Sequence, residues 1–282
     1  MTTEPKTITV PWVAAAPAAG HRLTMVTAYD YRHGRLVDAS GAEIVLVGDS
    51  LAMVVLGHDD TLSVTLEEML HHVRAVRRGV ERALLVADMP YGSFHLGPSQ
   101  AVESALAFVK QGGAQAVKIE GARPDVVRAL VDAEVPVMAH LGLTPQSLHR
   151  MGGYKVQGRG LSARRTLLEA AAELEEAGAF SLVLECVPAE LAAEVSERLE
   201  IPTIGIGAGR ECDGQVLVFH DLLGLEDRLA PKFVRRYAEL GREASEALER
   251  FVADVRSGEF PSADESYDDP TLEEDGVRKI YG

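Results

Sequence analysis

The chain has 282 residues, of which 46% are hydrophobic and 25% are charged. This composition excludes a disordered or fibrous protein, and the length suits a single α/β barrel. The 43 acidic and 28 basic residues give a net charge of −15, so a nucleic-acid partner is not expected, because such a surface repels phosphates. Six of the basic residues are lysine, and an acidic, lysine-poor surface is typical of adaptation to concentrated salt.

The number of cysteines and the hydropathy of the chain indicate in which cellular compartment the protein is expected. Two cysteines, Cys186 and Cys212, are too few for a disulfide framework. No run of 18 apolar residues is present, so no membrane span is expected. The Ala-rich stretch Pro11–Gly20 is short and broken by prolines, which favours a connecting segment over a signal peptide. The cytoplasm is therefore the expected location.

Eight short apolar runs recur along the chain, most of them ending in Gly, Pro, Asp or Glu. They are Leu23–Asp30, Glu43–Ser50, Ala83–Pro90, Ala116–Gly121, Val135–Leu143, Ser181–Pro188, Ile201–Gly209 and Val216–Leu223. Most of the intervals show helical spacing, as in Leu66–Arg77, Gln100–Gln111, Ala163–Ala177 and Glu190–Leu199. A strand followed by a helix, repeated eight times without a hairpin signal, predicts a parallel sheet closed as a (β/α)8 TIM barrel.

The domain organisation follows from composition. No linker rich in Pro, Ser or Gly divides the chain, so one barrel domain is expected over residues 23–258. An N-terminal segment, residues 1–22, precedes it, and an acidic extension, residues 259–282, follows. Within the extension Asp264–Asp275 carries seven acidic residues and no basic one, which is typical of a solvated tail.

Polar residues close several of the predicted strands, at the end where a barrel builds its active site. They are Asp49 and Ser50, Asp88, Lys118 and Glu120, and Glu185. Because side chains alternate along a strand, Lys118 and Glu120 share one face. By the same rule Val45, Val47 and Asp49 are expected to share an inward face. Four carboxylates and one ammonium group are thus expected at the barrel mouth.

Four neighbouring carboxylates repel one another unless a cation lies among them. Mg²⁺ prefers such oxygen ligands, and the sequence has no Cys/His cluster with zinc spacing. These carboxylates and the lysine suit a small anionic keto acid as substrate. The metal would acidify the C–H next to the keto group, and the lysine would neutralise the developing enolate or hold the substrate carboxylate. A remaining carboxylate would move the proton. A Schiff base on Lys118 is an alternative that a neighbouring metal would make redundant.

Six motifs then occur in order along the chain. They are VGDSLAMVVLGHDDTLSVT (Val47–Thr65), VKIEG (Val117–Gly121), HLGLTPQS (His140–Ser147), GGYKVQGRG (Gly152–Gly160), LVLECVP (Leu182–Pro188) and IPTIGIGAG (Ile201–Gly209). Together they resemble the ketopantoate hydroxymethyltransferase family, from about Thr24 to about Gly258.

The resemblance implies a barrel related to the phosphoenolpyruvate/pyruvate-binding enzymes, with one Mg²⁺ per subunit. Such an enzyme transfers a hydroxymethyl group from 5,10-methylenetetrahydrofolate to 3-methyl-2-oxobutanoate through a Mg-stabilised enolate. The product is 2-dehydropantoate, an intermediate of pantothenate and coenzyme A biosynthesis. The implied partners are the keto acid and a reduced pterin, and the implied assembly is a large homo-oligomer, a decamer.

The resemblance also implies residue roles. Asp49, Asp88 and Glu120 match the family's metal-associated acids. Asp49, Ser50, Asp88 and Lys118 match its keto-acid-binding positions, and Glu185 matches its proton acceptor. The sequence departs from the family near Asp60 and Ser63 and in the loop Tyr91–Pro98. These positions flank the expected lid.

Other functions stay open at this point. A Mg-dependent keto-acid carbon–carbon lyase or aldolase would use the same barrel. Such lyases often carry a catalytic Cys in a mobile loop, whereas Cys186 follows Glu185 on a strand and Cys212 lies beyond the seventh strand. A non-catalytic metabolite-binding barrel would need no base. No motif typical of pterin-ring binding is present, so the sequence does not distinguish a folate donor from a methanopterin donor.

Four further sequence features give weaker indications. Gly205, Gly207 and Gly209 favour close packing of a strand end over a phosphate cradle. His140 is either a structural residue or a partner of substrate or of a neighbouring acid. Asp213-Gly214 is predicted to be a turn. The loop Gly152–Gly160 is expected to bind a ligand or another subunit.

Overall fold

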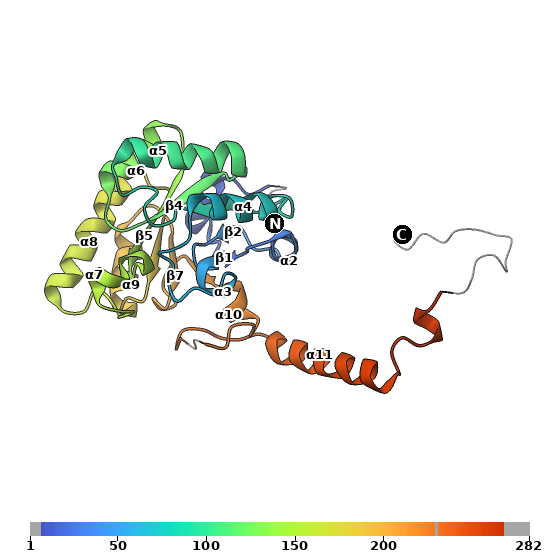
Figure 1. The fold of residues 1–282 in the computed structure, drawn as a ribbon. Coiled ribbons are helices and arrows are strands. Elements are labelled where there is room, and N and C mark those ends of the chain that lie inside the picture. Colours follow the sequence, from blue (N-terminus) through green and yellow to red (C-terminus); the bar gives the residue numbers. More distant parts are fainter. Residues whose placement is uncertain (1–6, 229–230, 268–282) are drawn as a thin grey trace.

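The computed structural model describes residues 7–228 and 231–267. Eight parallel strands close into a barrel in chain order (Figure 1). They are β1 (Leu23–Thr27), β2 (Ile44–Val47), β3 (Leu84–Asp88), β4 (Ala116–Glu120), β5 (Val137–Gly142), β6 (Ser181–Glu185), β7 (Thr203–Ile206) and β8 (Gly214–Leu217). The predicted TIM barrel is confirmed.

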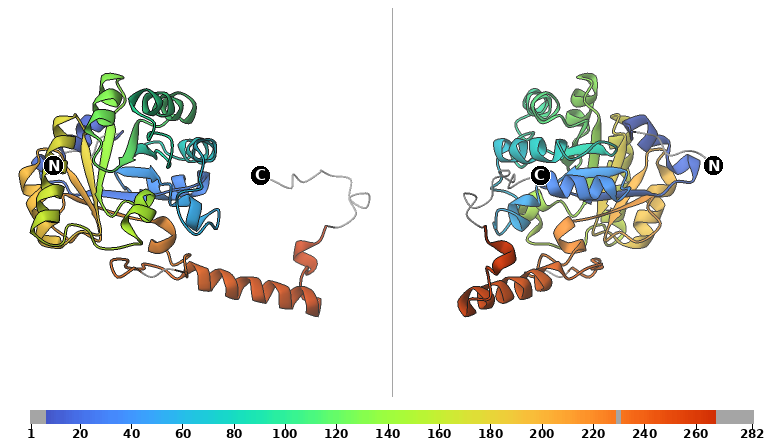
Figure 2. Two further views of the ribbon diagram at one scale, coloured as in Figure 1. Left: turned by 60° about the vertical axis from the view of Figure 1, so that its left-hand side comes forward. Right: turned by 90° about the vertical axis from the view of Figure 1, so that its right-hand side faces the viewer.

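Helices cover the outside of the barrel between successive strands (Figures 1 and 2). The α-helices are α1 (Val10–Ala15), α2 (Tyr31–Ala39), α3 (Leu51–Val54), α4 (Leu66–Arg77), α5 (Pro98–Ala107), α6 (Pro124–Asp132), α7 (Leu148–Met151), α8 (Leu161–Glu176), α9 (Ala189–Arg198), α10 (Phe219–Leu222) and α11 (Leu240–Ser257). Short 3-10 turns occur at Pro17–Ala19, Pro145–Ser147 and Ala263–Glu265, and a π turn at Phe108–Gly112 continues α5. The four helices predicted from spacing correspond to α4, α5, α8 and α9.

Two apolar layers separate the inside of the barrel from the outside. Ala116 and Val86 belong to the inner layer, whereas Val117 and Ile119 pack outward against the helices. Burial of one such Val or Ile side chain contributes about 1.5–3 kcal/mol, so both layers fix the register of the strands. Because side chains alternate, Lys118 and Glu120 follow Ala116 on the inner face, as predicted.

The expectation for β2 is wrong in one respect. Val45 and Val47 pack outward with the helix-facing layer, and Ile44 and Leu46 face the interior. Asp49 nevertheless lines the interior cavity, because β2 ends at Val47 and the chain turns before α3 begins at Leu51. The turn, and not strand alternation, aims the Asp49 side chain.

The N-terminal segment contains a helix where a connecting segment was expected. The Thr9 side chain accepts a hydrogen bond from the Trp12 N–H and caps α1, and Pro11 lies in the first turn, where its missing N–H costs nothing. Ile8 and Val13 are fully buried against the inner apolar layer. This segment therefore closes the end of the barrel opposite the strand carboxyl ends.

The last strand lies earlier than predicted. Its pairing begins at Gly214, where an added Cβ would approach the Leu23 carbonyl oxygen to 2.6 Å, so β8 and β1 need a glycine there. Asp213 accepts hydrogen bonds from the N–H and hydroxyl of Thr203 and joins β8 to β7. The remainder of the predicted strand forms α10. The prediction of a turn at Asp213-Gly214 is thus wrong.

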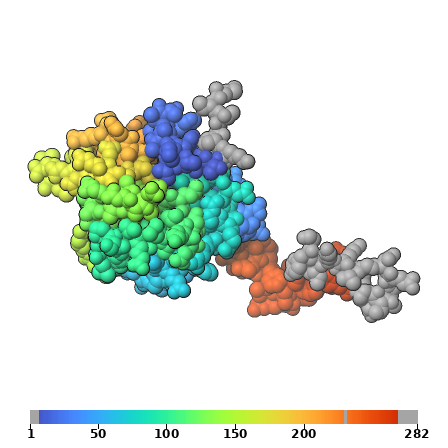
Figure 3. Space-filling model, turned by 90° about the horizontal axis from the view of Figure 1, so that it is seen from above, coloured from blue at the N-terminus to red at the C-terminus, as the bar shows by residue number. Residues whose placement is uncertain are grey.

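The C-terminal helix α11 extends away from the barrel body (Figures 1–3). It lies inside the predicted domain 23–258, so the division into residues 1–22, 23–258 and 259–282 stays a prediction. Of the predicted acidic tail, residues 268–282 lie outside the described residues. Among the helices of residues 7–228 and 231–267, none has the length and apolar character needed to cross a membrane.

Candidate active site

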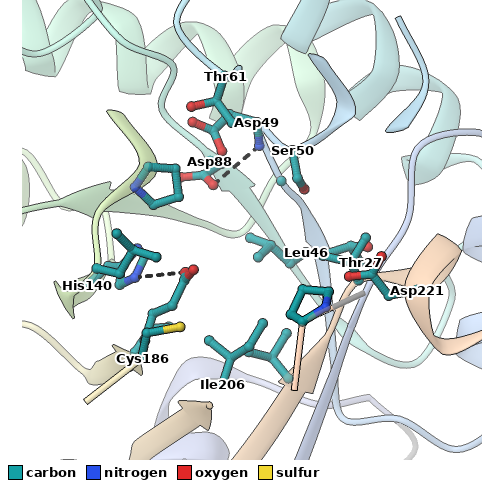
Figure 4. A pocket seen from close by; sticks show the side chains of 18 of the residues that line it. Thr27, Leu46, Asp49, Ser50, Thr61, Asp88, His140, Cys186, Ile206 and Asp221 are labelled. Carbon is teal, nitrogen blue, oxygen red and sulfur yellow. Dashed lines mark hydrogen bonds and ion pairs between the residues drawn. The ribbon is translucent and has the colours of Figure 1, made fainter. Parts of the chain in front are cut away.

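A cavity of about 500 Å³ opens at the carboxyl ends of the strands. Its lining includes every residue that the sequence analysis selected: Asp49, Ser50, Asp88, Lys118, Glu120 and Glu185. Figure 4 shows Asp49, Ser50, Asp88 and Thr61 grouped on one side of the cavity, with His140 and Cys186 on another. Six residues spread over 137 positions of sequence thus meet because parallel strands all end at the same rim.

Lys118 forms the centre of a buried ionic cluster. Its Nζ lies 2.9 Å from Asp88 Oδ2 and 3.9 Å from Glu120 Oε1, and all three side chains are buried. Burial alone lowers the pKa of Lys118, but the carboxylates of Asp88, Glu120 and Asp49 outweigh burial and raise this pKa above its usual value. Lys118 is therefore an ammonium ion, which disfavours Schiff-base chemistry.

Asp49 and Asp88 are neighbouring buried acids with an excess of negative charge. The Asp49 N–H donates to Asp88 Oδ2 at 3.3 Å, and Asp88 Oδ1 is buried without a partner. Burial, then repulsion from Asp88 and Glu120, raises the pKa of Asp49 well above its usual value. Burial likewise raises the pKa of Asp88, although Lys118 opposes the rise. A further cation beside these acids would offset the repulsion between their carboxylates.

The donor set fits Mg²⁺. Within residues 7–228 and 231–267 no group of three or more His, Cys, Asp or Glu side chains is placed to hold a metal ion by itself. Mg²⁺, however, commonly takes one or two carboxylates from the protein and its other ligands from substrate and water. The open Oδ1 of Asp88 and the adjacent carboxylate of Asp49 meet that requirement, and Glu120 adds negative charge close by.

Gln146 joins Asp49 to Glu120, and the sequence analysis did not single it out. Its Nε2 donates to Asp49 Oδ2 and to the Met89 carbonyl, both at 2.9 Å, and its backbone N–H donates to Glu120 Oε2 at 3.0 Å. Gln146 follows β5 in the 3-10 turn Pro145–Ser147. The only sequence signal for a role of Gln146 was its place in the HLGLTPQS motif. That signal is weak, because Gln is common in turns and the residues that Gln146 contacts are distant in sequence.

His140 joins the ionic cluster to Glu185. Its Nδ1 lies 3.2 Å from Lys118 Nζ and 3.6 Å from Glu120 Oε1, and its Nε2 lies 3.4 Å from Glu185 Oε2. Burial and Lys118 lower the pKa of His140, but Glu120 and Glu185 outweigh them and raise it overall. Of the two interpretations of His140, the geometry favours a partner of neighbouring acids.

Glu185 ends β6 at a point where the backbones of β5 and β6 approach closely. Cys186, the next residue, has a φ of 47°, and a Cβ on Gly142 would lie 2.2 Å from the Glu185 carbonyl oxygen. Gly142, with a φ of 95°, is therefore required at this point of β5. The Glu185 side chain is 17% exposed and so can meet a ligand in the cavity. Burial, then Glu185, raises the pKa of the Cys186 thiol to about 11.

Ser50 is held by Tyr29, a second residue that the sequence analysis missed. The Tyr29 and Ser50 hydroxyls lie 2.9 Å apart, and burial raises the pKa of Tyr29, so it stays a neutral hydroxyl. The deeper part of the cavity is apolar. It is formed by Met25, Leu46, Val183, Ile206 and Val216. An anionic head beside Lys118 and a small aliphatic chain against this floor would both be accommodated.

Two segments reach over the cavity. Tyr154, Lys155 and Val156 line it from the loop Gly152–Gly160, and Phe233 lines it from the segment before α11. An added Cβ on Gly207 would lie 2.8 Å from the Phe233 ring, and one on Gly209 would lie 2.6 Å from Ala189. The close-packing interpretation of these glycines is confirmed.

The sequence also matches a known family. Residues 7–263 match the family described as ketopantoate hydroxymethyltransferase. The chain belongs to the ketopantoate hydroxymethyltransferase family. Among its relatives, the 3-methyl-2-oxobutanoate hydroxymethyltransferase of Nitratidesulfovibrio vulgaris (strain DP4) is 57% identical over 248 residues, covering 87% of this chain and 81% of that protein. The protein of the same name from Carboxydothermus hydrogenoformans is 50% identical over 276 residues, covering 97% and 99%.

Solved structures place this family member among related barrels. A phosphonopyruvate hydrolase in complex with oxalate and Mg²⁺ has a TM-score of 0.60 at 14% identity, covering 91% of this chain and 93% of that one. A 2,3-dimethylmalate lyase of the PEP mutase/isocitrate lyase superfamily has a TM-score of 0.58 at 15% identity, covering 95% and 93%. At these identities the likeness shows the fold alone. The barrel fold is thus shared with these proteins, and the predicted phosphoenolpyruvate/pyruvate type stays a prediction.

Proposed function

We propose that this ketopantoate hydroxymethyltransferase family member adds a hydroxymethyl group to 3-methyl-2-oxobutanoate and forms 2-dehydropantoate. The donor is 5,10-methylenetetrahydrofolate, water supplies the hydroxyl oxygen, and the product enters pantothenate and coenzyme A biosynthesis. The observation that carries this proposal is the buried Asp49, Asp88, Lys118 and Glu120 cluster, linked through His140 to Glu185 above an apolar floor. The names of the relatives support it.

Asp49 and Asp88 would hold one Mg²⁺ per subunit, with Glu120 close by. When bound, the ion supplies Lewis acidity that polarises the keto group and weakens the adjacent C3–H bond. Gln146 keeps the Asp49 carboxylate oriented for this role through its 2.9 Å hydrogen bond.

Lys118 and Ser50 bind and orient the keto acid. The buried Lys118 ammonium, whose pKa the neighbouring carboxylates raise, attracts the substrate carboxylate and offsets negative charge that develops on the keto oxygen. The Ser50 hydroxyl, positioned by Tyr29, donates a further hydrogen bond. The isopropyl group then lies against the apolar floor, which leaves little room for water beside C3.

Glu185 accepts the C3 proton at its carboxylate. His140 lies 3.4 Å from Glu185 Oε2 and steadies this carboxylate, while its other nitrogen lies 3.2 Å from Lys118 Nζ. Loss of the proton leaves an enolate, and its C3 forms the new bond to the one-carbon unit of the donor. Both bonds from that carbon to the donor's nitrogens break, and water supplies the hydroxyl oxygen. The C3 proton and the two protons of water end on the hydroxyl and on the two nitrogens of tetrahydrofolate. This assignment gives each buried polar group of the cluster a task.

The first test is proton exchange at C3, followed by proton NMR of 3-methyl-2-oxobutanoate in D₂O and KCl, with and without Mg²⁺. Metal-dependent loss of the C3 proton signal is expected, and added methylenetetrahydrofolate should then yield 2-dehydropantoate. Exchange that begins after the folate is added would mean that donor binding completes the site. No exchange and no product would exclude the transferase assignment and favour the keto-acid lyase.

Glu185→Gln tests the base. The amide cannot accept the proton, so turnover should fall by about 10²–10⁴-fold while Mg²⁺ affinity changes little. Turnover is followed by product formation, and affinity by calorimetric titration. A parallel loss of metal affinity would contradict the role of Glu185 as base, because Glu185 would then belong to the metal site.

The lyase alternative lacks an activated thiol. The pKa of Cys186 is raised to about 11, and burial also raises the pKa of Cys212, so both thiols are protonated near neutral pH. A thiolate-dependent lyase would need the opposite shift. The raised pKa values of both thiols therefore weigh against the lyase and support the transferase.

The assembly and location belong to the same proposal. On α11 the side chains of Leu248, Phe251, Val252 and Val255 are exposed, which is compatible with the large homo-oligomer, a decamer, that the family resemblance implies. Light scattering during size-exclusion chromatography would measure the subunit number. The cytoplasm is the proposed location, in keeping with a biosynthetic role.

A further inference from the structure

A second cavity of about 650 Å³ lies beside the active site and shares its wall at Glu120. The loops after β2, β3, β4 and β5 form it, with Leu62 as the residue from the first of them. We call it the arginine pocket, after Arg123 and Arg150, and its other polar lining side chains include Tyr91, His95, Gln146 and His149. Nothing in the proposed reaction of the keto acid uses this space.

Arg123 is the most informative residue of the arginine pocket. It is half-buried just before α6, and its guanidinium lies over the buried Phe94 ring, with Cζ 5.3 Å from the ring centroid. Within residues 7–228 and 231–267 its side chain makes no ion pair or hydrogen bond with another residue. A guanidinium that lies against an aromatic ring and has no protein acceptor can donate to a planar anion.

Arg150 brings a second cation to the arginine pocket. Arg150 and His149 lie in the last turn of α7. The His95 Nδ1 accepts a hydrogen bond from the Gly92 N–H at 3.2 Å, which leaves the His95 Nε2 as a donor.

The acid of this lining is Glu120, and its oxygens are engaged elsewhere. Its Oε1 faces His140 and Lys118, and its Oε2 accepts from the Gln146 N–H. In a chain with a net charge of −15, unpaired positive charge is thus concentrated in one recess.

We propose that the arginine pocket binds carboxylate or phosphate groups at a site separate from the keto acid, with Arg123 as the principal contact. Two sources share this chemistry. One is the anionic tail of the reduced-pterin donor, which rests on the proposed function, and the other is a separate small anion. The wall shared with the active site favours the donor tail, because a pterin held over the keto acid could extend its tail across that wall.

The test measures anion binding directly, without turnover. Inorganic phosphate is titrated into metal-free enzyme saturated with 3-methyl-2-oxobutanoate, so that Lys118 is occupied, and ³¹P NMR reports the bound fraction. Arg123→Gln should weaken binding about ten-fold or more, and Arg123→Lys should retain part of it. The matched control is Arg128→Gln. Arg128 is exposed on α6, the helix that Arg123 precedes, and this variant should bind phosphate as the parent does. Equal affinity in the parent and in Arg123→Gln would overturn the proposal.

Competition then separates the two sources. If triglutamyl tetrahydrofolate displaces the phosphate, and Arg123→Gln raises the KM for the donor with little change in kcat, the pocket holds the donor tail. If phosphate stays bound beside the folate, the pocket serves a separate anion. Either result retains the anion site. Melting curves and C3 proton exchange, measured in Arg123→Gln and in Arg123→Lys, distinguish loss of the anion site from misfolding or from failure of the proposed function.

Discussion

At the scale of single residues, charge balance decides what the active site can hold. Asp49, Asp88 and Glu120 are each at most 4% exposed, and Lys118 is the cation among them. With all three acids ionised, two negative charges remain uncompensated, which is why burial and mutual repulsion raise the pKa of Asp49. A divalent cation would supply the missing charge, and protonation is the alternative in its absence.

Gln146→Leu should weaken metal binding. The substitution keeps the volume but removes the hydrogen bonds to Asp49 Oδ2 and the Met89 carbonyl, so the Asp49 carboxylate loses its orientation. Removal of such supporting hydrogen bonds typically lowers metal affinity about 10–100-fold. Calorimetric titration with Mg²⁺, or Mn²⁺ binding followed by electron paramagnetic resonance, measures the change.

Gln215→Leu is the matched control for this prediction. The Gln215 Nε2 also donates to a backbone carbonyl, that of Gly209, but its side chain is exposed and bonds to no acid of the site. Metal affinity in Gln215→Leu should equal that of the parent. Unchanged affinity in Gln146→Leu would show that Gln146 does not position Asp49 for the metal.

At the scale of elements, two helices far apart in sequence pack together beside β1. The ring of His33 on α2 stacks on Phe219 of α10 with centroids 4.1 Å apart, and His220 packs edge-on to His33 at 5.5 Å. Burial and the neighbouring His33 lower the pKa of His220 to about 4. Burial also lowers the pKa of His33, although Asp30 opposes the shift. This contact therefore requires neutral imidazoles.

The α2–α10 contact should make the protein less stable in mild acid. The pKa of His220 is lower in the folded chain than the ordinary value of 6.5, so its contribution is complete above pH 6.5 and is lost as pH falls toward about 4. The melting temperature should fall between pH 7 and pH 5, and the fall should be smaller in His220→Gln. Differential scanning calorimetry tests this. The same decline in both proteins would assign the acid sensitivity to other groups.

The strands were the most predictable elements, because each is a short apolar run buried on both faces. Seven of the eight runs overlap their strands closely, and β8 with α10 is the exception. There the apolar run Val216–Leu223 carries no mark of where the strand ends. A short apolar run fits a strand and a buried helical turn equally well, so packing against β1 and Thr27 decides.

At the scale of the whole molecule, the net charge of −15 sets the response to salt. Self-repulsion at low ionic strength opposes the compact state, and screening reduces it within a Debye length of about 10 Å at 0.1 M. The melting temperature should therefore rise as KCl increases from low to molar concentration at pH 7.

The same titration near pH 5 is the control for charge screening. The sequence pI is about 5.0, so self-repulsion is small there and added KCl should raise the melting temperature less. An equal rise at pH 5 and pH 7 would show that salt acts through exclusion from the protein surface and not through screening.

The barrel and most of the proposed catalytic residues could be predicted from the sequence. Hydrophobic periodicity is local, so strand–helix repetition is legible without coordinates, and the residue that closes each strand follows directly. Asp88, Lys118, Glu120 and Glu185 were found in this way. The family motifs added the expected roles, which the structure accommodates without testing them.

The tertiary structure alone decided which side chains act together. Gln146 and Asp49 are 97 positions apart, and Tyr29 and Ser50 approach through the turn after β2. The turn after β2, and not the alternation of the strand, orients the Asp49 side chain. The arginine pocket arises where four separate loops meet. Such contacts depend on closure of the barrel, which brings distant loops to one rim, and no local pattern in the sequence encodes them.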